Sequence, residues 1–168
     1  MTEEFTIDKL FNGQPSDLPR PVHLALHVSG KKCVIEIDAP YHGDPAPDAP
    51  AGRLWGLWDH EVVEIFLVDE KGQYIEAEFG PHGHYLLLRL SGPRQIIEAE
   101  LTMSYDAKIS KNGWKGHAEF DLSGIQRIDR VNCFAIYGQN EKRRYLAWSR
   151  LPGKVPDFHQ PDAFKHLT

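Results

Sequence analysis

The sequence predicts an all-β protein, an antiparallel β-sandwich with at most one or two short helices. Short apolar or alternating runs recur at intervals of roughly ten residues, as they do in sandwiches and barrels. Groups rich in Gly, Pro, Asn and Asp separate these runs and mark turns. Only one short stretch, near 122–126, is a plausible helix, and Asp121 or Ser123 can cap it.

The first predicted strand is 22–28, in which apolar residues alternate with His23, Ala25 and His27. A turn at 29–31 separates it from a second strand at 33–38. Residues 1–20, before the first strand, are expected to be a loosely attached N-terminal segment.

A long irregular loop is predicted at 39–53, because it contains four prolines, two glycines and two aspartates. Loops of this length inside a domain are uncommon and often functional. Seven further strands follow, at 61–68, 73–79, 84–90, 95–103, 115–121, 131–137 and 144–149. The tail, 152–168, is expected to be irregular and anchored by Phe158 and Phe164. We interpret 1–168 as a single domain.

Charged residues occupy strand positions where a core needs apolar groups. If the three strands from 61 to 90 pair antiparallel in order, period-2 alternation places four charged side chains on one face, opposite Leu86, Leu88 and Leu90. These four are Glu64, Glu76, Glu78 and Arg89. His23 and His27 would join this face if strand 22–28 is a neighbour. The face is either a solvated surface with cross-strand charge pairs or a partly covered site for a polar ligand.

The tryptophans fall into different settings. Trp55 and Trp58 lie in a glycine-flanked loop just before the strand that carries Glu64, where they either cap the sandwich or stack on a ligand. Trp114 begins an alternating strand and is expected in the core, whereas the position of Trp148 stays open.

Composition excludes several classes of protein. Hydrophobic residues make up 41% of the chain and charged residues 26%, as in soluble globular proteins. A net charge of −5, with a dense basic group only at 142–144, argues against nucleic-acid binding. No apolar run is long enough for a membrane helix, and the acidic amino terminus lacks a signal core, so a cytoplasmic protein is expected. Cys33 and Cys133 are expected to be buried thiols, although the sequence leaves their pairing open.

Several short motifs occur in a fixed order: His60-Glu-Val-Val-Glu-Ile-Phe, Tyr74-Ile-Glu-Ala-Glu, Pro81-His-Gly-His, Leu90-Ser-Gly-Pro-Arg, Trp114-Lys-Gly-His-Ala, Asn132-Cys-Phe-Ala-Ile-Tyr-Gly, Arg144-Tyr and Pro156-Asp-Phe-His. Together they resemble an uncharacterised family of small intracellular proteins found in eukaryotes and bacteria, over roughly residues 20–168. That family is similar to family-9 carbohydrate-binding modules and the DOMON-like β-sandwich group. Their signature strand is matched by Glu61-Val-Val-Glu-Ile-Phe66.

The resemblance implies a jelly-roll-like sandwich of about nine to eleven strands and non-catalytic binding of a sugar or another small ligand. Sugar modules of this type clamp the sugar between two tryptophans, and those two positions have no residue-by-residue match in this chain.

Metal and catalytic motifs are weak. His82 and His84 flank a glycine, but no HExxH, CxxC or EF-hand pattern accompanies them, so we predict neither metal nor cofactor. Glu76 and Glu78 point to one strand face, roughly 7 Å apart, a spacing that does not exclude glycosidase chemistry. Buried glutamates with raised pKa values would favour an enzyme, whereas an aromatic-walled groove would favour a binding protein.

We therefore predict non-catalytic binding of a carbohydrate or sugar-like molecule on a polar, aromatic-rimmed sheet face. The expected ligand-binding residues are Trp55, Trp58, Glu64, Glu76, Glu78 and Arg89. One alternative is a small hydrolase or isomerase that uses Glu64, Glu76 or Glu78 with a histidine. Another is a protein-interaction domain that uses an edge strand and the 39–53 loop. Neither nucleic acid nor membrane is an expected partner, and the oligomeric state stays open.

Overall fold

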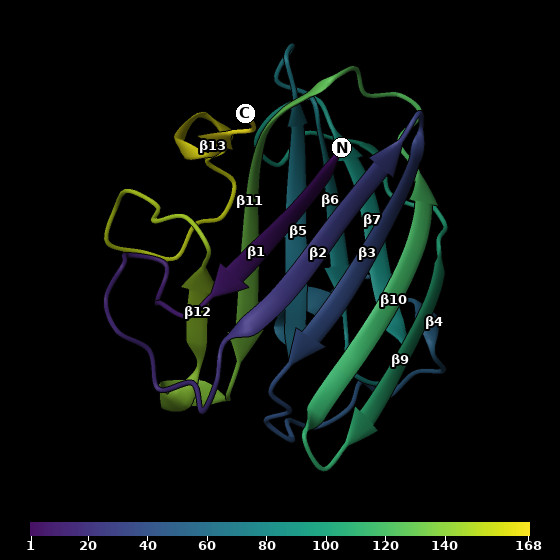
Figure 1. Ribbon diagram of the computed structural model, residues 1–168. Coiled ribbons are helices and arrows are strands. Elements are labelled where there is room, and N and C mark those ends of the chain that lie inside the picture. The colour runs from purple at the N-terminus through teal and green to yellow at the C-terminus, as the bar shows by residue number, and fades with distance from the viewer.

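Two β-sheets pack face to face in the computed structural model, which describes all residues 1–168 (Figure 1). The five-stranded sheet has the order β1 (Thr2–Ile7), β2 (Val22–Ser29), β3 (Lys32–Ala39), β10 (Gly113–Asp121) and β9 (Ser104–Ser110). The eight-stranded sheet has the order β12 (Arg144–Ala147), β11 (Ile128–Tyr137), β5 (Val62–Asp69), β6 (Tyr74–Phe79), β7 (His84–Leu90) and β4 (Gly52–Arg53). Two short strands complete it, because β8 (Ile96–Glu98) pairs with β7 and β13 (Lys165–His166) pairs with β11.

The predicted fold class, an all-β antiparallel sandwich, is confirmed. Every strand pair is antiparallel except β4 with β7. The chain forms thirteen strands, more than expected, and its helical elements are the single 3₁₀ turns η1 (Leu57–Asp59), η2 (Asn140–Lys142) and η3 (Pro161–Ala163). None of these turns has the length or the apolar character needed to cross a bilayer.

The N-terminal segment is more firmly attached than predicted. Residues 2–7 form β1, which pairs along its whole length with β2. Phe5 and Ile7 alternate with polar residues and are buried between the sheets. Two apolar positions are too short a pattern to identify from the sequence, and pairing with β2 supplies the remaining stabilisation.

Two other segments differ from the prediction. Residues 122–126 form a turn and not a helix, because Gly124 adopts a positive φ of 93° and Asp121 accepts a hydrogen bond from the Ser123 backbone. The strand expected at 95–103 is limited to the exposed β8, and the chain then enters β9, which the sequence reading missed.

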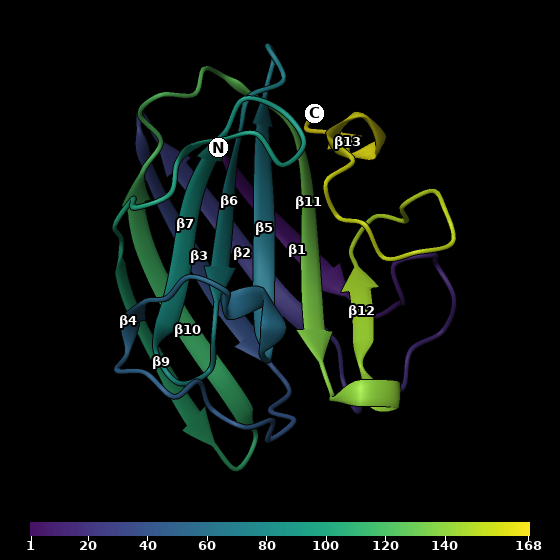
Figure 2. The same ribbon diagram turned by 180° about the vertical axis from the view of Figure 1, so that it is seen from behind.

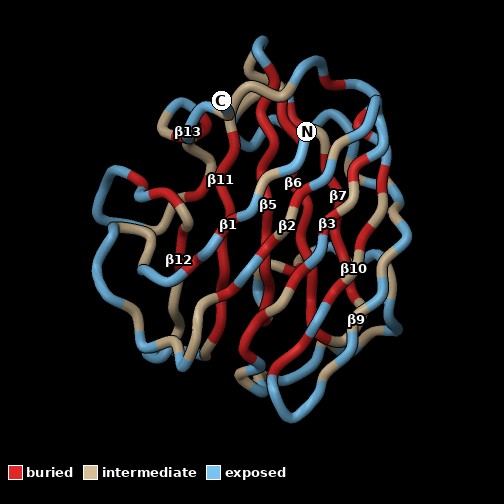
Figure 3. Tube along the Cα trace, viewed as in Figure 1, coloured by how far each residue is buried: buried red, intermediate tan, exposed pale blue.

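The eight-stranded sheet is buried on both faces. A cluster of 26 residues, which includes Trp114, fills the space between the two sheets. A second cluster of 14 residues lies on the outer face of the eight-stranded sheet, where η1 and the C-terminal tail cover it (Figure 2). Burial on both faces explains why every residue of β5 and β6 is buried (Figure 3).

The C-terminal tail is held in place by the two predicted anchors, Phe158 and Phe164, which are both buried in the outer cluster. The Phe158 ring stacks on Phe134 of β11, with ring centroids 4.0 Å apart. The tail therefore covers the outer face of the sheet.

Cys33 and Cys133 are free thiols buried in different sheets. Burial raises the pKa of Cys33 to about 12 and that of Cys133 well above its usual range. Both therefore pack as small apolar residues.

Candidate functional site

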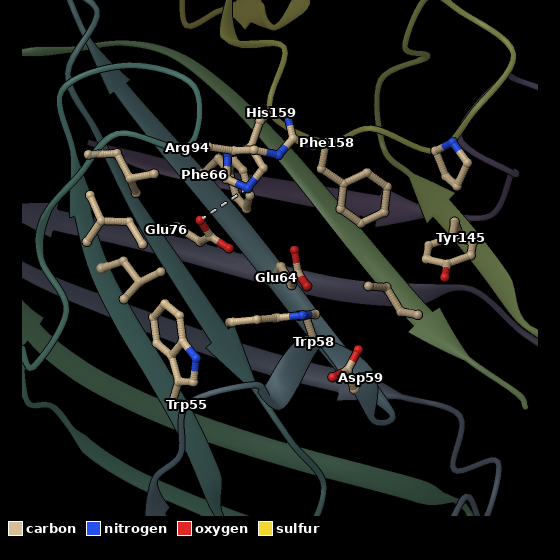
Figure 4. Close-up of a pocket in the computed structure, with 15 residues that line it drawn as sticks. Trp55, Trp58, Asp59, Glu64, Phe66, Glu76, Arg94, Tyr145, Phe158 and His159 are labelled. Carbon is tan, nitrogen blue, oxygen red and sulfur yellow. Dashed lines mark ion pairs between the residues drawn. The ribbon is translucent and has the colours of Figure 1, made fainter.

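A cavity of about 420 Å³ opens on the outer face of the eight-stranded sheet (Figure 4). Its floor is formed by side chains of β5, β6 and β7, among them Phe66, Leu88 and Leu90. Its walls come from η1, the turn between β7 and β8, β12 and the tail. The cavity exists because these segments cover the face incompletely.

Two glutamates project from the floor into the cavity. Glu64 of β5 and Glu76 of β6 are 2% and 5% exposed, and Figure 4 shows both carboxyl groups directed into the space between the walls. Glu78 lies beside them on the same face, directly opposite Glu64 in the β5–β6 register. It is completely buried and does not line the cavity.

Burial raises the pKa of all three carboxyl groups. Burial raises the pKa of Glu76 to about 7, an effect that the positive charge of Arg94 partly offsets. The pKa of Glu64 and that of Glu78 also rise well above their usual range because of burial and then repulsion from neighbouring glutamates. The site therefore holds several protons near neutral pH.

An imidazole from the tail reaches the floor. Nε2 of His159 lies 3.7 Å from Oε2 of Glu76, and Nδ1 hydrogen-bonds with the Tyr74 hydroxyl at 2.7 Å. Burial and then the nearby Arg94 lower the pKa of His159 to about 4. Because His159 is neutral at physiological pH, its approach to Glu76 is a polar contact and not a pairing of opposite charges.

Two indole rings form the mouth. Trp55 is 58% exposed, and its ring meets that of Trp58 edge to face, with centroids 5.0 Å apart and planes at 86°. Gly56 between them has a φ of 85°, which allows the sharp entry into η1, and the buried Leu57 anchors that turn. Arg143 fixes the segment by donating a 2.7 Å hydrogen bond to the Trp58 carbonyl.

The wall opposite the indoles is an ion pair. Arg94, in the turn between β7 and β8, donates hydrogen bonds of 2.7 and 3.4 Å to Asp157 of the tail. Asp157 also accepts a hydrogen bond from the His159 backbone. These contacts hold the tail, and with it the His159 imidazole, over the floor.

Four of the six predicted ligand-binding residues line this cavity: Trp55, Trp58, Glu64 and Glu76. Arg89 does not, and its predicted face was wrong. In the β6–β7 register Glu76 lies opposite Leu88 and Ile75 lies opposite Arg89. Arg89 therefore lies on the other face of the sheet, where it contacts Glu98 and the Gly124 carbonyl.

His23 and His27 do not join the face that carries the glutamates, because their strand belongs to the other sheet. His23 and His27 lie on the exposed face of the five-stranded sheet, where they contact Thr6 and Thr2. His84 is buried and hydrogen-bonds with the Ala49 carbonyl, while His82 contacts Tyr41. No group of three or more His, Cys, Asp or Glu side chains is arranged to hold a metal ion.

Several cavity residues were not predicted from the sequence: Asp59, Arg94, Tyr145 and His159. A signal for three of them was available. Arg94, Tyr145 and His159 belong to three short motifs that lie far apart in the chain: Leu90–Arg94, Arg144-Tyr and Pro156–His159. Only the folded chain brings these motifs around one cavity.

Comparison with known proteins identifies relatives over most of the chain. The human UPF0462 protein C4orf33 is 36% identical over 175 residues, covering 98% of this chain and 87% of its own. The homologue from Rattus norvegicus is 37% identical, covering 88% and 79% of the two chains, and that from Danio rerio is 33% identical, covering 98% and 88%. No family model matches the chain.

Among solved structures, the crystal structure of a candidate carbohydrate-binding protein from Bacteroides uniformis is similar to this fold, with a TM-score of 0.75. The match covers 98% of this chain and 84% of the other, at 16% sequence identity. At this identity the likeness shows a common fold.

Proposed function

The chain belongs to the UPF0462 family that includes C4orf33, and we propose that it binds a carbohydrate or sugar-like small molecule, without catalysis, in the cavity of the outer face. One observation carries the proposal: the exposed indole of Trp55 and the partly buried indole of Trp58 line the same cavity as buried carboxyl groups. Sugar rings present apolar C–H faces and polar hydroxyl edges, so stacking and hydrogen bonding are needed together.

The size of the cavity supports this function. Its volume of about 420 Å³ lies within the ~300–1,000 Å³ typical of small-molecule sites. Its lining is mainly apolar, with a few polar groups directed inward, chiefly Glu64, Glu76 and Arg94. This composition is typical of sites in which apolar contact supplies affinity and polar groups fix orientation.

The structural likeness to the Bacteroides protein supports the same reading. The relation to family-9 modules implied by the Glu61–Phe66 strand also belongs to this proposal. In this chain Trp55 and Trp58 would supply the stacking surface, although they meet edge to face and are not parallel plates. A ring would then rest against one indole and touch the edge of the other.

Calorimetric titration with a panel of mono- and disaccharides tests the proposal. We expect a sugar that binds wild type and binds Trp55→Ala about 5- to 150-fold more weakly, because one stacking indole contributes ~1–3 kcal/mol. Tyr41→Ala is the matched control, since Tyr41 is an exposed aromatic outside the cavity. A sugar that binds Trp55→Ala as tightly as wild type would exclude this site, and no sugar binding at millimolar concentration would contradict the function.

A small hydrolase or isomerase is the second candidate. The observation in its favour is that Glu64, Glu76 and Glu78 are buried with raised pKa values, and that a neutral imidazole lies 3.7 Å from Glu76. A protonated carboxyl beside a neutral base is an arrangement that acid–base catalysis uses. Turnover of chromogenic glycosides that is lost in Glu76→Gln would favour this candidate over simple binding.

A further inference from the structure

The charge balance around the cavity is one-sided. Three carboxyl groups line it, those of Asp59, Glu64 and Glu76, and Glu78 lies immediately behind. The cations nearby are already engaged. Arg94 is paired with Asp157, and Arg143 donates to the carbonyls of Gly138, Trp58 and His60.

Three oxygens of the buried carboxyl groups lack a donor, and none of them belongs to Glu64. Oε2 of Glu76 and both side-chain oxygens of Glu78 have no hydrogen-bond partner. Glu76 is more than nine-tenths buried, yet its carboxyl group is directed into the cavity (Figure 4). Buried polar atoms in native proteins normally have a hydrogen-bond partner, so these unpaired oxygens point to a partner that the protein itself does not supply.

A buried carboxyl group without a partner has two ways to avoid an uncompensated charge. It either takes up a proton, which is what the raised pKa values of Glu64 and Glu76 indicate, or it receives a positive charge from a ligand. The cavity also presents the π faces that stabilise a cation, because Trp55 and Trp58 stand at its mouth.

We propose that the ligand of this cavity carries a positively charged amine, and that the sugar is therefore an amino sugar whose ammonium group lies between Glu64 and Glu76 within reach of the indoles. This inference rests on the proposed function, because it takes the ligand to be a sugar. The ammonium group supplies a hydrogen-bond donor to Oε2 of Glu76, which has none, and its positive charge replaces the protons of the two carboxyl groups.

Proton release follows from this arrangement. The groups that face the two glutamates are Asp59, Tyr74, Glu78, Arg94, Arg143 and His159. His159 stays neutral because burial lowers its pKa to about 4, so it does not compete as a cation. Below pH 7 protons occupy the carboxyl groups and oppose the amine, so affinity for the amine rises as pH increases from 6 toward 7.

Four probes test the inference on the wild-type protein by calorimetry at pH 6 and pH 7. They are glucose, glucosamine, N-acetylglucosamine and cyclohexylamine, which separate the sugar ring from the charge. At pH 7 we expect glucosamine to bind at least about tenfold more tightly than glucose or N-acetylglucosamine. The difference in affinity between glucosamine and the two neutral sugars should shrink at pH 6. Glucosamine binding should also release protons, which is measured by repeating the titration in buffers of different ionisation enthalpy.

The outcomes separate the inference from the proposed function. If glucose binds as tightly as glucosamine, the amine inference is overturned and sugar binding stands. If cyclohexylamine binds and no sugar does, the cation site stands and sugar binding is overturned. If no probe binds at millimolar concentration, both are overturned.

Two variants, Glu64→Gln and Glu76→Gln, test where the charge of the ligand lies, and Glu4→Gln is their control. Glu76→Gln keeps the shape of the side chain and removes its charge, so it should reduce the preference for glucosamine over N-acetylglucosamine. Glu4→Gln, on the exposed face of β1, should leave that preference unchanged. A preference retained in both Glu64→Gln and Glu76→Gln, with melting temperatures showing folded protein, would exclude these carboxyl groups as the amine site.

Discussion

Glu76 and His159 lie together on the cavity floor, with 3.7 Å between Oε2 of the carboxyl group and Nε2 of the imidazole. One comes from a central strand and the other from the C-terminal tail. Each pKa shifts in the direction that favours the neutral form of the group: the pKa of Glu76 rises to about 7 and that of His159 falls to about 4. The floor of the site is therefore polar but largely uncharged below pH 7.

The first prediction concerns pH and stability. The unfolded chain loses the Glu76 proton near pH 4.5, whereas the folded protein keeps it to about pH 7. The stabilisation from this group is therefore complete below pH 4.5 and is lost as pH rises through 7. The effect of His159 on stability has the opposite sign, but it is confined to the range between about pH 4 and pH 6.5. We expect the free energy of unfolding to fall between pH 6.5 and 8.

Urea denaturation of Glu76→Gln measures this effect. The variant cannot ionise, so it should lose less stability over that range and exceed wild type at pH 8 by on the order of 1 kcal/mol. Glu4→Gln, an exposed carboxylate on β1, is the control and should follow the wild-type profile. A Glu76→Gln profile parallel to wild type would contradict the raised pKa.

The second prediction concerns the tail. Phe158 stacks on Phe134 and is 7% exposed, so Phe158→Ala should lower the free energy of unfolding by about 3–5 kcal/mol. Deletion of 157–168 removes Phe164 as well and should lower it by several kcal/mol more. Thermal denaturation measures both. Val155→Ala, at a residue that is 68% exposed, should change little, and an unaltered melting temperature after truncation would show that the tail contributes nothing.

The third prediction concerns a buried amide. Asn132 donates from Nδ2 to the Ser149 carbonyl at 2.9 Å, and its Oδ1 accepts from the backbone of Cys133 and Ser149. Asn132→Ala leaves these buried groups unpaired and should lower the free energy of unfolding by ~2–4 kcal/mol. Asn132→Asp keeps the acceptor and loses the donor. Equal stability of all three proteins in urea would show that the network contributes nothing.

The fourth prediction concerns the 39–53 loop. Glu61 accepts backbone hydrogen bonds from His42 at 2.6 Å and from Asp44 at 3.3 Å, so it ties the loop to the start of β5. Glu61→Ala should increase amide hydrogen exchange at 40–46 by about fivefold or more, because it removes two hydrogen bonds that contribute about 0.5–1.5 kcal/mol each. Glu61→Gln retains one acceptor, so its exchange rate should lie between those of wild type and Glu61→Ala. Exchange unchanged in Glu61→Ala would mean that other contacts hold the loop.

Local patterns were sufficient for the fold class and for most strands. Alternation in 22–28 and the mostly apolar run of β5, interrupted by Glu64, identify strands, because side chains alternate between the two faces along a strand. The strand β1 was missed because only Phe5 and Ile7 face the core. The same local logic placed Glu64, Glu76 and Glu78 on a common face, and the β5–β6 register agrees.

The sequence by itself determined the sandwich class, the turns, the tail anchors Phe158 and Phe164, and the proximity of Trp55 and Trp58 to Glu64. Tertiary structure decided the face of Arg89, because β7 is apolar on both sides and its composition cannot select a register. It also decided that Arg94 and His159 enter the cavity, since they lie far apart in the chain and meet only where the β7–β8 turn and the tail pack over the same sheet face. Side-chain parity is a property of one strand, whereas register and tail docking depend on how much apolar surface the whole chain buries.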